Sequence, residues 1–216
     1  MNAEEATDST ADASRERTSD DDIRADVARG KLAPEWDVHS MNLQTMKDAT
    51  KPLFTNDCGV CESLLFLSNR QSGKTTMLVR YLVAIMTETT HSVKIGIVAS
   101  GKERSSMIMR EACSYMNIQL PMSAYSAIVH SDNGSLVHLK CMKCTDTGAV
   151  IDLAIVDEPT LNSDPNAMSK NYPCIMVGTD TGFGVEFHNT RIIDQRITQD
   201  GVEHPEFIPP WKKYTQ

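Results

Sequence analysis

Residues 64–76 read Leu-Leu-Phe-Leu-Ser-Asn-Arg-Gln-Ser-Gly-Lys-Thr-Thr, an apolar run followed by a polar turn. The apolar run predicts a buried strand, and the nearly all-apolar stretch at 77–86 predicts a helix packed against a sheet. A strand, a turn with Gly-Lys-Thr and a helix, in this order, form the layout of a P-loop, whose backbone N–H groups bind phosphate. The chain is therefore expected to form an α/β sheet with an anion-binding turn at the end of one strand.

The turn departs from the usual P-loop pattern G-x-x-x-x-G-K-[ST], because Ser68 stands at the first glycine position. Gly73 still lets the backbone approach a phosphate closely, Lys74 can reach the β- and γ-phosphates, and Thr75 can ligate Mg²⁺. Gly-Lys-Thr alone also occurs at ordinary helix starts, but the strand–turn–helix setting favours a nucleotide site. The nucleotide-binding residues predicted from this turn are Ser68, Gln71, Ser72, Gly73, Lys74, Thr75 and Thr76.

A second apolar run ends in two carboxylates. Residues 151–156 read Ile-Asp-Leu-Ala-Ile-Val and predict a strand, and Asp157 and Glu158 follow it directly. This is the Walker B pattern, in which Asp157 supports Mg²⁺ through water and Glu158 polarises the attacking water. An Asp-Glu pair before a proline is otherwise a solvated turn, but the P-loop upstream favours the catalytic interpretation.

A third apolar run, residues 174–177, is followed at 178–182 by the turn Gly-Thr-Asp-Thr-Gly. A hydroxyl at the end of such a strand can detect whether a γ-phosphate is present, which makes Thr179 a candidate sensor. An ordinary glycine-rich turn explains this segment equally well when it is taken alone.

The two ends of the chain differ in composition from its body. Residues 1–30 carry nine acidic and four basic residues, a net charge of −5 out of −8 for the whole chain. We predict an acidic disordered tail over residues 1–32 and an irregular, proline-containing tail over residues 201–216. No signal peptide is predicted, and no apolar run reaches the roughly 18 residues that a membrane helix needs, so no membrane partner is expected.

Residues 33–200 are predicted to form one P-loop ATPase domain. Further strands are predicted at 94–99 and 136–142, and a helix is predicted at 103–117. The apolar residues at helical spacings in that helix are Met107, Ile108, Ala112 and Met116. Alternating strands and helices predict an α/β fold of the P-loop NTPase class, with a mostly parallel central sheet flanked by helices and the ligand at the carboxyl ends of the strands.

The six cysteines are Cys58, Cys61, Cys113, Cys141, Cys144 and Cys174. Two pairs have C-x-x-C spacing, and His138 precedes the second pair, so a four-ligand zinc site is conceivable. The first pair, however, precedes the first strand, whereas the second pair lies near the end of another. Parallel strands would place the two pairs at opposite ends of the sheet, so a zinc site is not expected. Free thiols in a reducing compartment are expected instead.

Together the three motifs resemble the ATPase domain of viral DNA-packaging terminase large subunits, of the herpesvirus type. Those proteins commonly replace the first P-loop glycine and carry an arginine inside the loop, as Ser68 and Arg70 do here. The sequence Val-Gly-Thr-Asp-Thr-Gly at 177–182 is similar to their Ser/Thr-Asn-Thr-Gly turn. The resemblance covers about residues 60 to 195.

The resemblance implies roles for several residues. Arg70 would stabilise charge in the transition state, Glu158 would act on water, and Thr179 would couple hydrolysis to motion. Gln44, thirty residues before Lys74, would read adenine. The implied ligand is ATP with Mg²⁺.

The resemblance also implies partners: viral double-stranded DNA, a portal protein, other terminase subunits and further copies of the chain in a homo-oligomeric ring, in the nucleus of the host cell. Two departures stand out. Terminase large subunits carry a C-terminal nuclease, but only about twenty residues follow Arg196, so either the nuclease is encoded separately or this chain is one exon or fragment. The second departure is that the sequence has no visible basic stripe for binding DNA, and its pI is about 5.2.

Scattered basic residues remain as candidate DNA contacts, namely Lys102, Arg104, Arg110, Lys140 and Lys143. Two alternatives stay open at this point. One is a helicase-like or other P-loop ATPase without a packaging role, although a helicase needs a second motor lobe. The other is a regulatory protein that binds nucleotide without hydrolysing it.

Overall fold

In a computed structural model of the chain, the structure describes residues 34–55, 57, 59–68, 72–146, 148–161, 166–179 and 187–195. The chain divides into two units, Met1–Asp37 and Val38–Gln216, and the fold described below is that of the second unit. The tails predicted at 1–32 and 201–216 lie outside the described residues.

The helices are α2 (Pro34–Ala49), α3 (Lys74–Glu88), α4 (Lys102–Tyr115) and α5 (Ala167–Asn171), with short 3-10 turns η1 (Lys51–Leu53) and η2 (Pro159–Leu161). The strands are β1 (Ser63–Leu67), β2 (Val93–Val98), β3 (Ser126–His130), β4 (Leu136–Met142), β5 (Leu153–Asp157), β6 (Cys174–Gly178) and β7 (Thr190–Asp194). The predicted strands at 64–67, 94–99, 136–142, 151–156 and 174–177 correspond to β1, β2, β4, β5 and β6.

Within the described residues, seven strands form one sheet in the order β3-β4-β2-β5-β6-β1-β7. Every pairing is parallel except that of β3 with β4. The predicted α/β fold with a mostly parallel central sheet flanked by helices is therefore confirmed. The sheet also has two strands that were not predicted. Strand β3 forms an antiparallel hairpin with β4, and β7 extends the sheet beyond β1.

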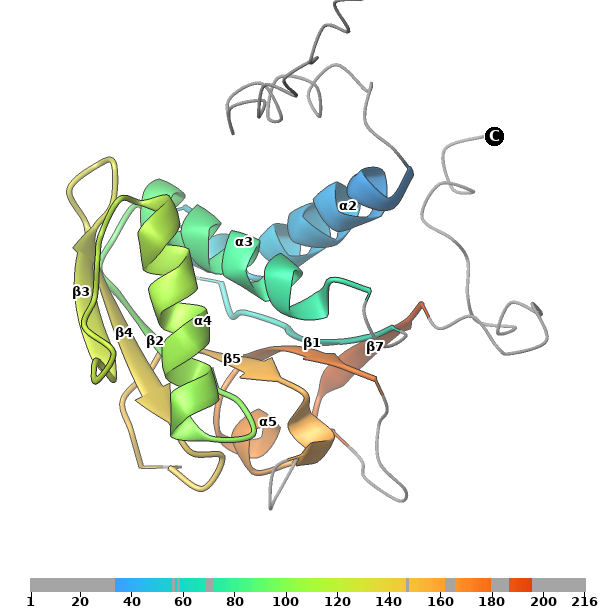
Figure 1. The fold of residues 1–216 in the computed structure, drawn as a ribbon. Helices are drawn as coiled ribbons and strands as arrows, with labels where there is room; N and C mark the ends of the chain where they lie inside the picture. Colours follow the sequence, from blue (N-terminus) through green and yellow to red (C-terminus); the bar gives the residue numbers. More distant parts are fainter. Residues whose placement is uncertain are drawn as a thin grey trace, which may run out of the picture. The chain divides into compact units, whose positions relative to one another are not determined.

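Helices cover both faces of the sheet (Figure 1). Leu64 and Phe66 of β1 belong to a core shared with α2, α3 and α4, whereas Leu65 and Leu67 belong to a core on the opposite face that includes Met168 of α5. Side chains alternate between the two faces of a strand, so a strand buried on both faces must be apolar at every position. This requirement explains the continuous apolar run that precedes the predicted P-loop.

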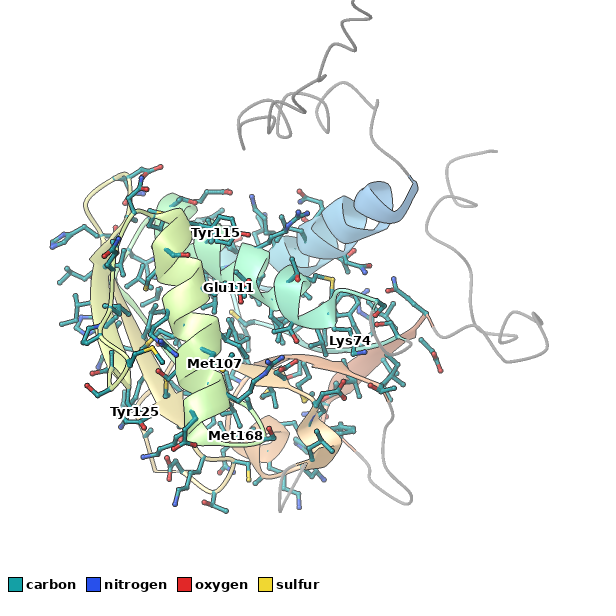
Figure 2. All side chains as sticks on the ribbon, in the orientation of Figure 1. Lys74, Met107, Glu111, Tyr115, Tyr125 and Met168 are labelled. Carbon is teal, nitrogen blue, oxygen red and sulfur yellow. The ribbon has the colours of Figure 1, made fainter. Side chains whose placement is uncertain are left out.

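Helix α4 presents two different faces. Ile108 and Ala112 are buried under the sheet, as the helical spacing predicts. Met107 and Tyr115 lie on the other face with Glu111 between them (Figure 2), and the two apolar side chains are 50% and 46% exposed. Met107 therefore does not belong to the buried stripe. No helix in the described part of the chain is long and apolar enough to cross a membrane.

Three strands of the sheet end at one edge. Leu67 of β1 lies level with Gly178 of β6, and Val177 of β6 lies level with Asp157 of β5. The predicted phosphate turn, the carboxylate pair and the predicted sensor turn each follow one of these ends. The sheet therefore brings the three sequence motifs to the same place.

Gly96 in the middle of β2 offers a test of how tightly the second core is packed. A Cβ atom at this position would lie 2.6 Å from Met142 Sδ and 2.8 Å from Ile151 Cδ1. We expect Gly96→Ala to lower the free energy of unfolding by about 1–3 kcal/mol, because neighbouring side chains must leave their rotamers. Urea denaturation measures this. Gly148→Ala is the matched control, because no atom lies within 4 Å of its Cβ position; equal stability of the two variants would contradict the packing.

Candidate functional site

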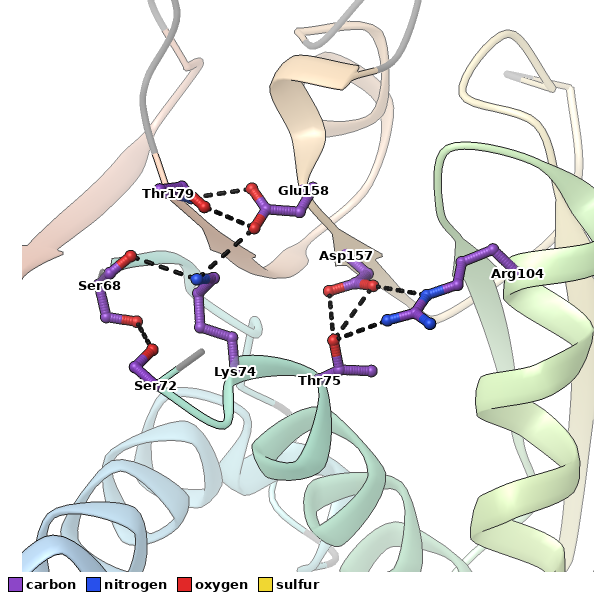
Figure 3. Close-up of polar contacts among 8 residues, drawn as sticks. All are labelled: Ser68, Ser72, Lys74, Thr75, Arg104, Asp157, Glu158 and Thr179. Carbon is purple, nitrogen blue, oxygen red and sulfur yellow. Dashed lines mark hydrogen bonds and ion pairs between the residues drawn. The ribbon is translucent and has the colours of Figure 1, made fainter. Parts of the chain in front are cut away.

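The site is built where β1, β5 and β6 end and α3 begins (Figure 3). The ladder of hydrogen bonds continues past the strand ends, because the Ser68 N–H donates to Gly178 O (3.0 Å) and the Glu158 N–H donates to Val177 O (2.8 Å). The backbones of Ser68 and Glu158, the first residues after β1 and β5, are thus held by the neighbouring strand β6.

The turn into α3 depends on Gly73. This residue has φ +77° and ψ 18°, in the left-handed region, and its carbonyl accepts the first helical hydrogen bond from Met77 N–H (2.9 Å). Residues other than glycine adopt this backbone conformation only at a cost in free energy. The conformation allows the chain to turn from the loop into the helix within one residue, so that Lys74 is already helical.

Lys74 is buried, with 8% of its side chain exposed. Its Nζ donates a hydrogen bond to Ser68 O (3.3 Å) and lies 3.6 Å from Glu158 Oε1. Ser68 and Ser72 lie at the two sides of the turn, with their Oγ atoms 2.7 Å apart. The ammonium group is therefore held over the turn, where an anion bound to the N-terminus of α3 would meet it.

Thr75 and Asp157 form the second part of the site. Thr75 Oγ1 lies 3.2 Å and 3.3 Å from the two carboxylate oxygens of Asp157 and donates a hydrogen bond to them. Asp157 is 4% exposed, and burial raises its pKa, opposed by the positive charge of Arg104 and by the hydrogen bond from Thr75. A hydroxyl and a carboxylate are the oxygen ligands that Mg²⁺ prefers, so this pair fits the predicted metal.

Glu158 turns back toward β6 by means of an unusual backbone conformation. Its φ is +51°, in the left-handed region. Its carboxylate accepts hydrogen bonds from the Thr179 N–H at Oε2 (2.8 Å) and from Thr179 Oγ1 at Oε1 (2.7 Å). Successive strand residues would point to opposite faces, and the left-handed turn brings Glu158 to the same edge as Asp157. Thr179 therefore fixes the orientation of the carboxylate that also faces Lys74.

Arg104, in the first turn of α4, is a site residue that the sequence reasoning missed. Its Nε lies 3.4 Å from Asp157 Oδ2, and its Nη2 donates a hydrogen bond to Thr75 Oγ1 (3.1 Å). We predicted it only as one of several surface residues for DNA. A usable signal exists: α4 follows a parallel strand, β2, whose carboxyl end lies at the same edge as that of β5.

The remaining predicted residues stay predictions. Arg70 and Gln71 lie outside the described residues. Thr76 is exposed in the first turn of α3. In the described part of the chain, the polar network of Figure 3 does not include Gln44, which lies exposed on α2 and donates a hydrogen bond to Asp48 (2.7 Å).

The cysteines show the geometry of separate thiols. Cys61, Cys113, Cys141 and Cys174 are free thiols, and Cys58 lies outside the described residues. Burial raises the pKa of Cys61, Cys113 and Cys141 to about 11 and that of Cys174 to about 12. Cys61 precedes β1 and Cys144 follows β4, at opposite ends of the parallel strands. Within the described residues, no three histidine, cysteine or acidic side chains form a metal-binding group.

No protein-family model and no curated protein matches the sequence. Among solved structures, the chain is similar to the large terminase ATPase domain of Thermus phage P74-26, with 13% identity and a TM-score of 0.46, over 64% of this chain and 77% of that one. It is also similar to the large terminase of bacteriophage HK97, with 20% identity and a TM-score of 0.38, over 69% of this chain and 33% of that one. The chain thus matches about a third of the HK97 protein.

The left-handed turn at Gly73 predicts a cost for any side chain there. We expect Gly73→Ala to lower the free energy of unfolding by about 1–2 kcal/mol, because alanine is strained at φ +77°. Gly101→Ala is the control, because Gly101 also precedes a helix but has φ −171°, which any residue adopts. Denaturant titration of both variants measures the difference. If the two variants were equally stable, the turn would not require glycine.

Proposed function

We propose that this chain is an ATP-hydrolysing motor subunit that drives viral double-stranded DNA into a capsid. One observation carries the hydrolytic part of the proposal. Glu158 is fixed by two hydrogen bonds from Thr179 and lies 3.6 Å from Lys74 Nζ, beside the Thr75–Asp157 pair. A base, a cation for phosphate and a pair of oxygen ligands for Mg²⁺ are thereby gathered at the N-terminus of one helix.

Binding of the triphosphate is assigned to the turn and the start of α3. The N–H groups at the N-terminus of α3 and the ammonium group of Lys74 would bind the phosphates, with Gly73 giving the backbone close access. Thr75 and Asp157 would hold the Mg²⁺, which neutralises charge on the β- and γ-phosphates when it is bound. Ser68, Gln71, Ser72 and Thr76 complete the proposed contacts, and Gln44 is proposed to read adenine.

Hydrolysis would be an in-line attack of water on the γ-phosphorus, which forms a new P–O bond while the bond to the bridging oxygen of ADP breaks. Glu158 would orient and polarise that water by accepting a hydrogen bond from it. Little else is required of the protein, since positioning and electrostatics provide most of the catalysis. Arg70 is proposed to stabilise the charge that develops on the transferred group.

Thr179 is proposed to link hydrolysis to movement. It binds the Glu158 carboxylate through both its backbone N–H and its side chain, and it directly follows β6. A shift of Glu158 on loss of the γ-phosphate would therefore be transmitted to the turn after β6. The packaging role, the ring of identical subunits, the portal and terminase partners and the nuclear location rest on the sequence resemblance.

The proposal is tested by ATP turnover of the purified chain with and without double-stranded DNA. We expect Lys74→Ala and Glu158→Gln to reduce turnover at least about a hundredfold, because each removes a group that acts on the transition state. Glu158→Gln should keep its affinity for ATP. Glu111→Gln on the exposed face of α4 makes the same chemical change away from the site and is expected to behave as the wild type.

Addition of double-stranded DNA is expected to raise wild-type turnover, as a DNA motor requires. Turnover that is unchanged in both Lys74→Ala and Glu158→Gln would remove the ATPase assignment. Turnover that depends on Glu158 but ignores DNA would keep the ATPase and remove the motor.

The hydrogen bonds from Thr179 to the Glu158 carboxylate give a second prediction. Thr179→Val keeps the backbone hydrogen bond but loses the one from Oγ1, and we expect kcat to fall by about fivefold with little change in KM, since one hydrogen bond contributes about 1 kcal/mol. Thr179→Ser keeps the hydroxyl and should retain most of the activity. Steady-state kinetics compare the two variants. A loss as large in Thr179→Ser as in Thr179→Val would show that the methyl group matters and the hydroxyl does not.

A further inference from the structure

The guanidinium of Arg104 contacts the same two groups that are proposed to hold Mg²⁺. Nη2 donates to Thr75 Oγ1 (3.1 Å), and Nε lies 3.4 Å from Asp157 Oδ2 (Figure 3). The positive group therefore contacts both the hydroxyl and the carboxylate, which are also hydrogen-bonded to each other.

We propose that Arg104 and the divalent cation compete for Thr75 and Asp157, so that binding of the cation displaces the arginine from the site. The inference rests on the proposed function, because it takes Thr75 and Asp157 as the Mg²⁺ site. It adds a residue of α4 to that site and gives it a role opposed to cation binding.

Simultaneous occupancy is excluded by distance and by charge. A Mg²⁺ ligand lies about 2.0–2.1 Å from the ion, so the ion would have to sit on the hydroxyl where Nη2 now donates. Two like charges a few ångströms apart repel strongly where one wall of the site is as buried as Asp157, which is 4% exposed. One of the two cations must therefore leave.

The side chain of Arg104 is the group that can leave. It is 44% exposed, whereas that of Asp157 is only 5% exposed. Its helix is anchored by other residues, among them the buried Ile108 and Ala112 further along α4. The guanidinium can thus move further into solvent by rotation about the bonds of its flexible stem.

The guanidinium also has a reason to be in the site. A carboxylate as buried as that of Asp157 needs a positive partner or a proton, and Arg104 supplies the charge. Exchange of guanidinium for a divalent cation keeps Asp157 paired throughout. The same competition weakens the hold on the metal, which would favour release of the metal with ADP after hydrolysis.

The test is Mn²⁺ binding to the full chain, followed by electron paramagnetic resonance, first with Mn²⁺ alone and then with ADP present. We expect Arg104→Gln to bind Mn²⁺ at least about fivefold more tightly than the wild type, the lower end of typical coupling between two sites. Arg104→Lys, which keeps the charge but not the fork of donors, should fall between the two. The matched control is Arg110→Gln on the same helix, whose guanidinium contacts Ser106 O, and it should bind Mn²⁺ as the wild type does.

Unchanged or weaker Mn²⁺ binding by Arg104→Gln, in protein whose urea unfolding matches the wild type, would overturn the inference and make Arg104 a residue that positions Asp157. Should Arg104→Gln fail to fold, the same outcome for Arg104→Lys would decide. Failure of the proposed function looks different: the wild type and Arg110→Gln would then bind neither ADP nor ATP, whatever Arg104 does to Mn²⁺.

Discussion

The common edge at which β1, β6 and β5 end is the constraint on which the rest of the site depends. Strand β6 lies between the other two, and its pairing partners Leu67 and Asp157 are set by the register of a parallel ladder. A shift of one residue in either pairing would turn every side chain of that strand to the opposite face. Because β1 is apolar on both faces, polarity alone does not select its register, and the fit of Leu64 and Phe66 in one core and of Leu65 and Leu67 in the other must do so. Core packing, far from any charge, therefore fixes where the charged groups meet.

Among the described residues, that edge carries two cations and two anions, and each anion has a cationic neighbour from another segment. Lys74 faces Glu158 at 3.6 Å, and Arg104 faces Asp157 at 3.4 Å. Charges as buried as Lys74 and Asp157 are tolerated only when they are paired, which explains why each has a partner of opposite charge. The pairing differs in stability, since Lys74 is 8% exposed while Arg104 is 44% exposed. Of the two cations in the described part of the site, Lys74 is thus buried and Arg104 is accessible to solvent.

Much of the fold follows from the sequence, because the strands of a parallel sheet that is buried on both faces are continuous apolar runs. Five strands and helices α3 and α4 were predictable in this way. Strand β3 was not, because only Val129 among its residues is buried and the pattern therefore resembles a surface loop. Strand β7 has no buried residue and was missed for the same reason.

The site was predictable where its chemistry is local. Gly73, Lys74 and Thr75 are neighbours in the chain, and Asp157 and Glu158 are neighbours too. Arg104 was not identified as a site residue, because its partner Asp157 lies 53 residues away and the one signal for it is its place just after the carboxyl end of β2. The residues next to Glu158 in the sequence do not indicate its left-handed conformation either. The hydrogen bonds that hold Glu158 in place involve Thr179 and Val177, which are distant in the chain.

The two carboxylates are held by different parts of the molecule, and this division has a mechanical consequence. Asp157 is bound by Arg104 from the first turn of α4, whereas Glu158 is bound by Thr179 from the turn after β6. In the proposed function, Asp157 would respond to the cation, and Glu158 would respond to the terminal phosphate and its water. Loss of the phosphate would therefore act first on β6, and loss of the cation on α4. Because β6 lies in the middle of the sheet while α4 packs on its surface, the two steps of product release would move different layers in sequence rather than the whole domain at once.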